Sequence, residues 1–293
     1  MPFDVLPAVA TLAATITTRD GLKLALTHWP APAREGLKGV VCLVHGLGEH
    51  TGRYQGLAKH LNQWGWAVVA HDHRGHGRSG GPRGGLVKSD DLLHDLAAVI
   101  DTVRKAYPQE RLMMLGHSLG GLVTARFVSA LAKPLEDAAW RRSVDLCVLS
   151  SPALALWMSG FQKLALDSVG RLTPDIAVGN GLKPAWVCSD PSVVKEYVDD
   201  PLVHDRITGR LTRFMLNSGR IAFERAPAWT VPTLVQYAGA DRCVRPDGSA
   251  RFAAALPAGL STVHLYEHMS HEIYLEPDRT RVMADLQAWL SSH

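Results

Sequence analysis

The sequence predicts an α/β fold with a mostly parallel central sheet, helices on both faces of the sheet and an inserted helical cap. Three observations lead to this prediction. Short apolar strands alternate with amphipathic helices along most of the 293 residues. One strand, residues 111–115, runs directly into a helix through a serine that is flanked by glycines. Between two later strands, about eighty residues show no strand pattern, which is too long for a loop in a compact fold.

The elements expected before the serine start with a hairpin over residues 14–30 that turns at Asp20–Gly21. Ser89 is placed to cap the helix at 90–106, whose apolar residues recur on one face. The predicted elements up to and around the serine are strand 40–44, helix 54–64, strand 67–70, helix 90–106, strand 111–115 and helix 119–131.

The apolar pattern in the second half of the chain predicts strands at 145–149, 231–237 and 262–266, followed by a closing helix at 280–290. The chain then divides into a core made of residues 1–151 and 230–293 and a cap or lid made of residues 152–229. The first part of the cap places five apolar residues on one helical stripe, and its later part, 203–223, is a more charged amphipathic segment. The stripe consists of Leu154, Trp157, Met158, Phe161 and Leu164.

Composition excludes several classes of partner. Lys and Arg total 31 against 28 Asp and Glu, and the sequence contains no run of five like charges. We therefore expect no nucleic acid as a partner. The N-terminal apolar stretch lacks a basic lead-in, and Asp4 lies where a signal peptide carries positive charge, so we expect a cytoplasmic protein. No apolar segment approaches the roughly 18 residues that span a bilayer. The four widely spaced cysteines are expected to be unpaired thiols.

The stretch GHSLGG, residues 116–121, raises the question of why a polar residue ends an apolar strand. A strand that turns at once into a helix strains the backbone at the corner, and Gly116 and Gly120 relieve the crowding there. The turn exposes the hydroxyl of Ser118 and leaves the N–H of Leu119 at the positive end of a helix. Ser118 is therefore a candidate nucleophile.

A serine hydroxyl needs a base and an orienting carboxylate. In a parallel sheet such residues collect at the carboxyl ends of the strands. Asp241 is the first carboxylate beyond strand 231–237, and His268 and His271 follow strand 262–266, which gives the chain order Ser, Asp, His of an α/β-hydrolase.

The oxyanion that forms when the serine attacks a carbonyl needs two backbone donors. Leu119 supplies one N–H. The glycine-rich loop HGLGEH, which follows strand 40–44, lets the N–H of Leu47 point at the pocket as the second. His45 and His50 are expected to brace this loop.

Several stretches occur in the order and rough spacing of the monoacylglycerol lipase and lysophospholipase branch of the α/β-hydrolases, which the chain resembles from about residue 14 to its final helix. The resemblance implies Ser118 as nucleophile, Asp241 as acid and His271 as base, with Leu47 and Leu119 as oxyanion donors, a small-molecule ester or lipid substrate and no cofactor. The cap matches poorly, so acyl-chain length and head group are not implied. The matching stretches are VHGLGEHTGRY (44–54), AHDHRGHGRSGGPRG (70–84), LGHSLGG (115–121), DPL (200–202), GADR (239–242) and SHEIYLE (270–276).

Other interpretations stay open. A serine hydrolase of the same fold could cleave amides, thioesters or carbon–carbon bonds, and a receptor could keep the scaffold without turnover. A haloalkane dehalogenase or epoxide hydrolase would need a carboxylate at position 118, so the serine found there excludes those members of the fold. HDHRGH, residues 71–76, lacks the ligand order of a zinc hydrolase, so we expect a hydrogen-bonded loop and no metal. Trp157, Met158 and Phe161 either line an acyl pocket or pack on neighbouring helices, and weak peripheral membrane contact would go through the cap.

Overall fold

The central feature of the fold is one sheet of eight strands in the order β1-β2-β4-β3-β5-β6-β9-β10. The structure, a computed structural model, describes residues 12–31, 36–160, 166, 168 and 172–293. The β1–β2 and β2–β4 pairs are antiparallel and every other pair is parallel, which confirms the predicted fold class. The strands are β1 (Thr15–Thr17), β2 (Lys23–Trp29), β3 (Gly39–Val44), β4 (Trp66–His71), β5 (Leu112–His117), β6 (Leu146–Ser150), β9 (Thr233–Ala238) and β10 (Ser261–Tyr266).

Both faces of the sheet are buried. Along β3, Val40, Cys42 and Val44 belong to one apolar cluster, whereas Val41 and Leu43 belong to another, because successive side chains of a strand point to opposite faces. Helices supply many of the other residues in each cluster. The first cluster includes residues of α2 (Asp91–Ala106), α3 (Leu119–Ser129), α7 (Gly209–Arg225) and α8 (Pro246–Ala255), and the second includes α1 (Gln55–Gln63) and α9 (Arg279–Ser292).

The start of α2 differs from the expectation. Ser89 was expected to cap this helix, but Asp90 holds the N-cap position and makes no side-chain cap hydrogen bond, so that expectation is wrong. Asp91 Oδ2 instead accepts the backbone N–H groups of Val87, at 3.1 Å, and Lys88, at 2.7 Å. The carboxylate that organises the turn therefore lies inside the helix rather than before it.

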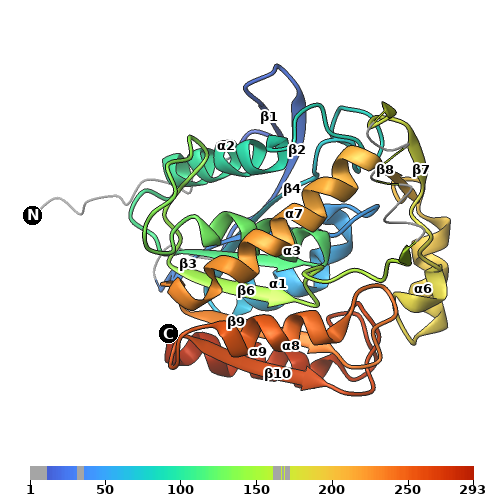
Figure 1. Cartoon of the computed structure of the whole chain (residues 1–293). Coiled ribbons are helices and arrows are strands. Elements are labelled where there is room, and N and C mark those ends of the chain that lie inside the picture. Colours follow the sequence, from blue (N-terminus) through green and yellow to red (C-terminus); the bar gives the residue numbers. More distant parts are fainter. Residues whose placement is uncertain (1–11, 32–35, 161–165, 167, 169–171) are drawn as a thin grey trace, which may run out of the picture.

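The proposed cap, residues 152–229, contains a small antiparallel pair of strands, β7 (Ala177–Gly179) and β8 (Arg206–Thr208). The sequence predicted no strand here, and that prediction is wrong. Each strand has only three residues and all three residues of β7 are exposed, so there is no apolar alternation to detect. In Figure 1 both strands lie together with α6 (Pro191–Asp199), at the same side of the molecule. The described residues of the proposed cap also form the 3₁₀ turns η2 (Pro184–Trp186) and η3 (Ala226–Ala228).

The last α-helix of the proposed cap, α7, packs against α3. Its buried residues Leu211, Phe214 and Met215 belong to the same apolar cluster as α3. The more charged amphipathic segment predicted from the sequence is thus a helix with one face against α3. Within the described parts of the chain, no helix is both long enough and apolar enough to cross a membrane.

Candidate active site

Ser118 occupies the corner between β5 and α3. Its φ of 53° and ψ of −118° place a non-glycine residue in a sparsely populated backbone region. A Cβ at Gly120 would lie 2.0 Å from the carbonyl oxygen of Val44, so only glycine lets the start of α3 approach the end of β3 so closely. The strained corner predicted from the glycine spacing is therefore confirmed. The Ser118 N–H donates to the carbonyl of Ser150 at 3.0 Å, which fixes the corner against the end of β6.

Asp241 and His271 meet at the same edge of the sheet, because they follow the parallel neighbours β9 and β10. His271 Nδ1 lies 2.7 Å from Asp241 Oδ2. The other oxygen, Asp241 Oδ1, accepts the backbone N–H groups of Cys243 at 2.8 Å and Val244 at 2.9 Å. Two backbone N–H groups thus hold one oxygen of the carboxylate, and the other oxygen faces the imidazole. His268, the other candidate base, is exposed.

The pair has the electrostatics of a base held by an acid. Burial acts to lower the pKa of His271, but the Asp241 carboxylate and its hydrogen bond outweigh burial and raise the pKa above its usual value. Burial lowers the pKa of His117, the chain neighbour of Ser118, and the His271 ring, 4.7 Å away between centroids, lowers it further. Of these two imidazoles, His271 is therefore the one suited to accept a proton near neutral pH.

The glycine-rich loop after β3 lies against the serine corner. A Cβ at Gly46 would be 3.1 Å from Ser118 Cβ, so the backbone of this loop approaches the nucleophile closely. His45 Nε2 accepts the N–H of His73 at 2.9 Å, which leaves Nδ1 to donate to the carbonyl of Gly46 at 2.7 Å. That carbonyl and the Leu47 N–H share one planar peptide and point in opposite directions.

His45 therefore fixes the direction of the Leu47 N–H, which confirms that this histidine braces the loop. His50 braces the other end of the loop, because its Nε2 lies 2.7 Å from Oδ2 of Asp200 in the proposed cap. Leu47 itself is half-buried and packs on the apolar cluster of α3. Leu119 is the first residue of α3, where a backbone N–H has no partner within the helix.

A group of buried charged residues beside this loop was missed by sequence reasoning. Glu49, Arg53 and Glu272 form two ion pairs, with Arg53 Nε 3.2 Å from Glu49 Oε2 and Arg53 Nη2 2.6 Å from Glu272 Oε2. Burial raises the pKa of Glu272 to about 7, while Arg53 opposes this effect. The available signal was the spacing of Glu49 and Arg53 at i and i+4 within the loop segment that carried the family resemblance.

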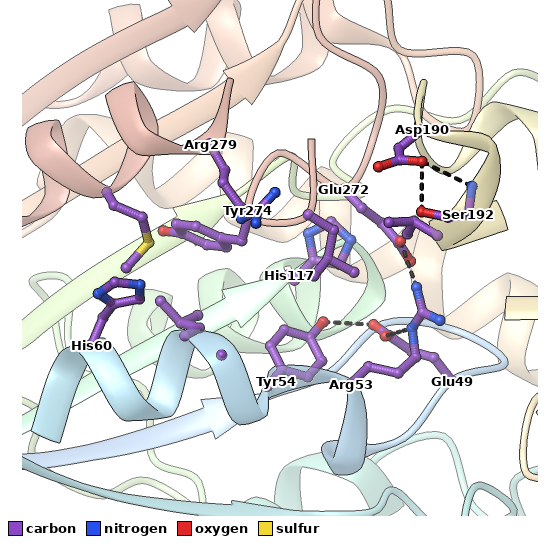
Figure 2. A pocket seen from close by; sticks show the side chains of 15 residues that line it. Glu49, Arg53, Tyr54, His60, His117, Asp190, Ser192, Glu272, Tyr274 and Arg279 are labelled. Atoms are coloured by element: carbon purple, nitrogen blue, oxygen red, sulfur yellow. Dashed lines mark hydrogen bonds and ion pairs between the residues drawn. The ribbon is translucent and has the colours of Figure 1, made fainter. Parts of the chain in front are cut away.

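A cavity of about 400 Å³ lies next to these charges. Figure 2 shows Glu49, Arg53, Tyr54 and Glu272 along one part of its wall, with His117 near its centre. Its lining contains His117 and Glu272, the chain neighbours of Ser118 and His271, but it contains neither of those two residues. The cavity therefore adjoins the candidate active site from the side of α1 and α9 without including the candidate nucleophile.

Of the three residues predicted to line the pocket, the structure describes Trp157 and Met158. Trp157 is 57% exposed, and the Arg245 guanidinium lies 5.4 Å from its ring centre. Met158 is half-buried, and Phe161 lies outside the described residues. Residues 154–158 are not helical, so the predicted helical stripe is wrong over this part. The reason is local: the Ala153 N–H donates to the Ser118 carbonyl at 2.9 Å, which holds the chain against the serine corner.

One group in the described part of the chain brings together three side chains of types that bind metals. Potential ligand atoms of Asp241, Cys243 and His271 lie within 4.8 Å of one another. The hydrogen bond between Asp241 and His271 already occupies one atom of each residue. Burial raises the pKa of the Cys243 thiol, which disfavours the thiolate form that binds metals. The arrangement suits acid–base chemistry better than metal binding.

Comparison with known proteins identifies the family. Residues 35–278 match the family model described as serine aminopeptidase, S33. A monoacylglycerol lipase of Mycolicibacterium smegmatis is 33% identical over 259 residues, which are 87% of this chain and 89% of that protein. The crystal structure of the Paleococcus ferrophilus monoacylglycerol lipase has a TM-score of 0.80 at 33% identity and covers 92% of this chain and 99% of its own.

A soluble variant of the Saccharomyces cerevisiae monoglyceride lipase, solved with a substrate analogue, shares the fold with a TM-score of 0.83 at 22% identity. The alignment covers 100% of this chain and 98% of that one. The chain belongs to the serine aminopeptidase S33 family of α/β-hydrolases, in the branch similar to the monoacylglycerol lipases.

Proposed function

We propose that this chain, a carboxylic ester hydrolase of the lipase type, cleaves monoacylglycerols, lysophospholipids or similar lipid esters through an acyl-enzyme on Ser118. The observation that carries the proposal is the 2.7 Å hydrogen bond between His271 and Asp241, at the same sheet edge as the strained Ser118 corner. Relatives named monoacylglycerol lipase and monoglyceride lipase support the choice of substrate class.

In the proposed reaction, Ser118 Oγ adds to the ester carbonyl while His271 Nε2 takes the hydroxyl proton. Asp241 holds Nδ1 of the imidazole, and the N–H groups of Leu47 and Leu119 stabilise the oxyanion. The bond to the alcohol breaks as His271 returns the proton to the leaving oxygen. Water then attacks the acyl-enzyme, giving its proton to His271, and the collapse of the second tetrahedral intermediate releases the carboxylic acid and the serine.

A substrate panel tests the proposal. Wild type and Ser118→Ala are assayed on monoacylglycerols of increasing chain length, a lysophospholipid, an aryl ester, an acyl thioester and an aminoacyl anilide. The proposal expects higher kcat/KM on the lipid esters than on the anilide and thioester, and loss of all turnover in Ser118→Ala. Preference for the anilide would instead favour the aminopeptidase activity for which the family is named. Retained ester hydrolysis in a folded Ser118→Ala protein would reject Ser118 as the nucleophile.

A further inference from the structure

The side chain of Glu49 is bonded to the loop that carries the proposed oxyanion donor. Its Oε1 accepts the backbone N–H of Gly46 at 2.6 Å and the hydroxyl of Tyr54 at 2.6 Å. A Cβ at Gly46 would lie 2.7 Å from the same oxygen, so the carboxylate is packed directly on the glycine. Glu49 is 4% exposed, and it holds the peptide before Gly46 while His45 holds the peptide after it.

Arg53 connects Glu49 to the segment of the candidate base. The guanidinium bridges Glu49 Oε2 and Glu272 Oε2, and Glu272 directly follows His271. The Glu272 N–H in turn donates to the Val187 carbonyl at 2.8 Å, and the guanidinium of Arg53 lies 4.8 Å from the ring centre of Tyr197. Figure 2 shows how Arg53 lies between the two carboxylates on the wall of the cavity. One buried cation thus links the loop after β3 to the loop after β10.

Stability alone does not account for this arrangement. Two carboxylates and one guanidinium are buried together, and removing charged groups from water costs as much free energy as such pairs usually recover. Apolar residues of similar volume would stabilise the same space at least as well. What they could not do is accept the N–H of Gly46 and fix the peptide plane beside the serine corner.

We propose that Glu49 is a positioning residue that holds the oxyanion loop in its working conformation, and that Arg53 ties this loop to the His271 segment. The inference rests on the proposed function, since it needs the Leu47 N–H to bind an oxyanion. Glu49 does not touch the substrate in this role. It acts through Gly46, and its loss should weaken the binding of the transition state more than the binding of the ester.

The test compares Glu49→Met, which keeps the size but removes the acceptor, with Glu49→Gln, which keeps one acceptor oxygen. Tyr54→Phe removes only the hydroxyl donor. Glu136→Gln is the matched control, because Glu136 also pairs with an arginine, Arg126 at 2.7 Å, but at the far end of α3. For each protein we measure kcat and KM on an aryl ester and the inhibition constant of an alkyl trifluoromethyl ketone, whose serine adduct carries an oxyanion.

Removing one oxyanion donor costs about 10² to 10³-fold in kcat, so a misplaced donor in Glu49→Met should cost about 10²-fold with KM changed less than about threefold. The inhibitor should weaken in the same proportion as kcat. Glu49→Gln should lose about tenfold, whereas Tyr54→Phe and Glu136→Gln should lose about twofold or less. Where Glu49→Met does not fold by circular dichroism, parallel losses in kcat and inhibitor affinity in Glu49→Gln carry the same conclusion.

A folded Glu49→Met protein with unchanged kcat and inhibitor affinity, and only a lower melting temperature, would overturn the inference. If Glu49→Met does not fold, a Glu49→Gln protein that loses neither kcat nor inhibitor affinity would also overturn the inference. The failure of the proposed function looks different. There, the wild-type protein itself would neither hydrolyse the ester nor bind the ketone, and the inference would fall with it.

Discussion

We expect four buried histidines to make the stability of the fold sensitive to acid. His45, His71, His73 and His76 are each no more than 2% exposed, and neighbouring ring centroids lie 4.3 to 5.8 Å apart. Burial lowers the pKa of His71 to about 4 and that of His76 to about 3. Among the described residues, neither ring nitrogen of His71 has a hydrogen-bond partner. Protonation of the neutral ring would therefore add a second N–H group without an acceptor among these residues.

The size of the effect follows from the change in pKa. Because the pKa of His71 is about 4 in the folded protein and 6.5 as a free group, the unfolded chain binds more protons between these values. The contribution of His71 to stability is full above pH 6.5 and declines as the pH falls below it. Moving from pH 7 to pH 5 should lower the free energy of unfolding by about 2 kcal/mol through this residue alone.

The variant His71→Leu removes this titration. We expect the drop in unfolding free energy between pH 7 and pH 5 to be about 2 kcal/mol smaller in His71→Leu than in wild type. Any packing cost of leucine appears at both values of pH and cancels. Glu272, whose raised pKa of about 7 acts in the opposite direction, is present in both proteins and cancels as well.

Urea unfolding followed by tryptophan fluorescence at the two pH values measures the drop directly. His60→Leu, which replaces an exposed histidine of α1, is the matched control and should behave as wild type. An equal drop in His71→Leu and wild type would refute the reasoning, because it would mean that His71 is protonated to the same extent in the folded and unfolded states.

Three further predictions concern the site. His271→Ala should lower kcat on a short aryl ester by about 10⁴-fold or more, whereas His268→Ala should cost about tenfold or less; the reverse order would reject His271 as the base. Gly48→Ala should reduce both stability and kcat more than Gly21→Ala. The two glycines have similar φ values of 78° and 82°, but only a Cβ at Gly48 would collide, because it would lie 2.2 Å from the His204 carbonyl oxygen. Equal losses would show that the contact between this loop and the proposed cap is unimportant. Phe161→Ala should shift the preferred acyl-chain length, each buried methylene contributing about 0.8 kcal/mol, and an unchanged profile in esterase assays would support a packing role alone.

The parts of the site that could be predicted from the sequence depend on local geometry or on sheet topology. The strained corner at Ser118 follows from glycine spacing within six residues. The meeting of Asp241 and His271 follows from the rule that parallel strands end at one edge. Both are general properties of the backbone, so no knowledge of individual side-chain contacts was needed.

The parts that could not be predicted depend on contacts between distant side chains. Arg53 and Glu272 are 219 positions apart, and nothing in either segment marks the two as partners. The same holds for His50 and Asp200, which join the loop after β3 to the proposed cap. The strands β7 and β8 escaped detection because they are short and carry few buried side chains.

The central claim is that Ser118 is an activated nucleophile, and the site of covalent labelling tests it most directly. The wild-type protein is treated with a fluorophosphonate, digested and analysed by mass spectrometry, with Ser118→Ala treated in parallel. We expect one stoichiometric adduct on the peptide that contains Ser118, and none in the variant. An adduct on another serine, or an unlabelled wild-type protein that still hydrolyses esters, would contradict it.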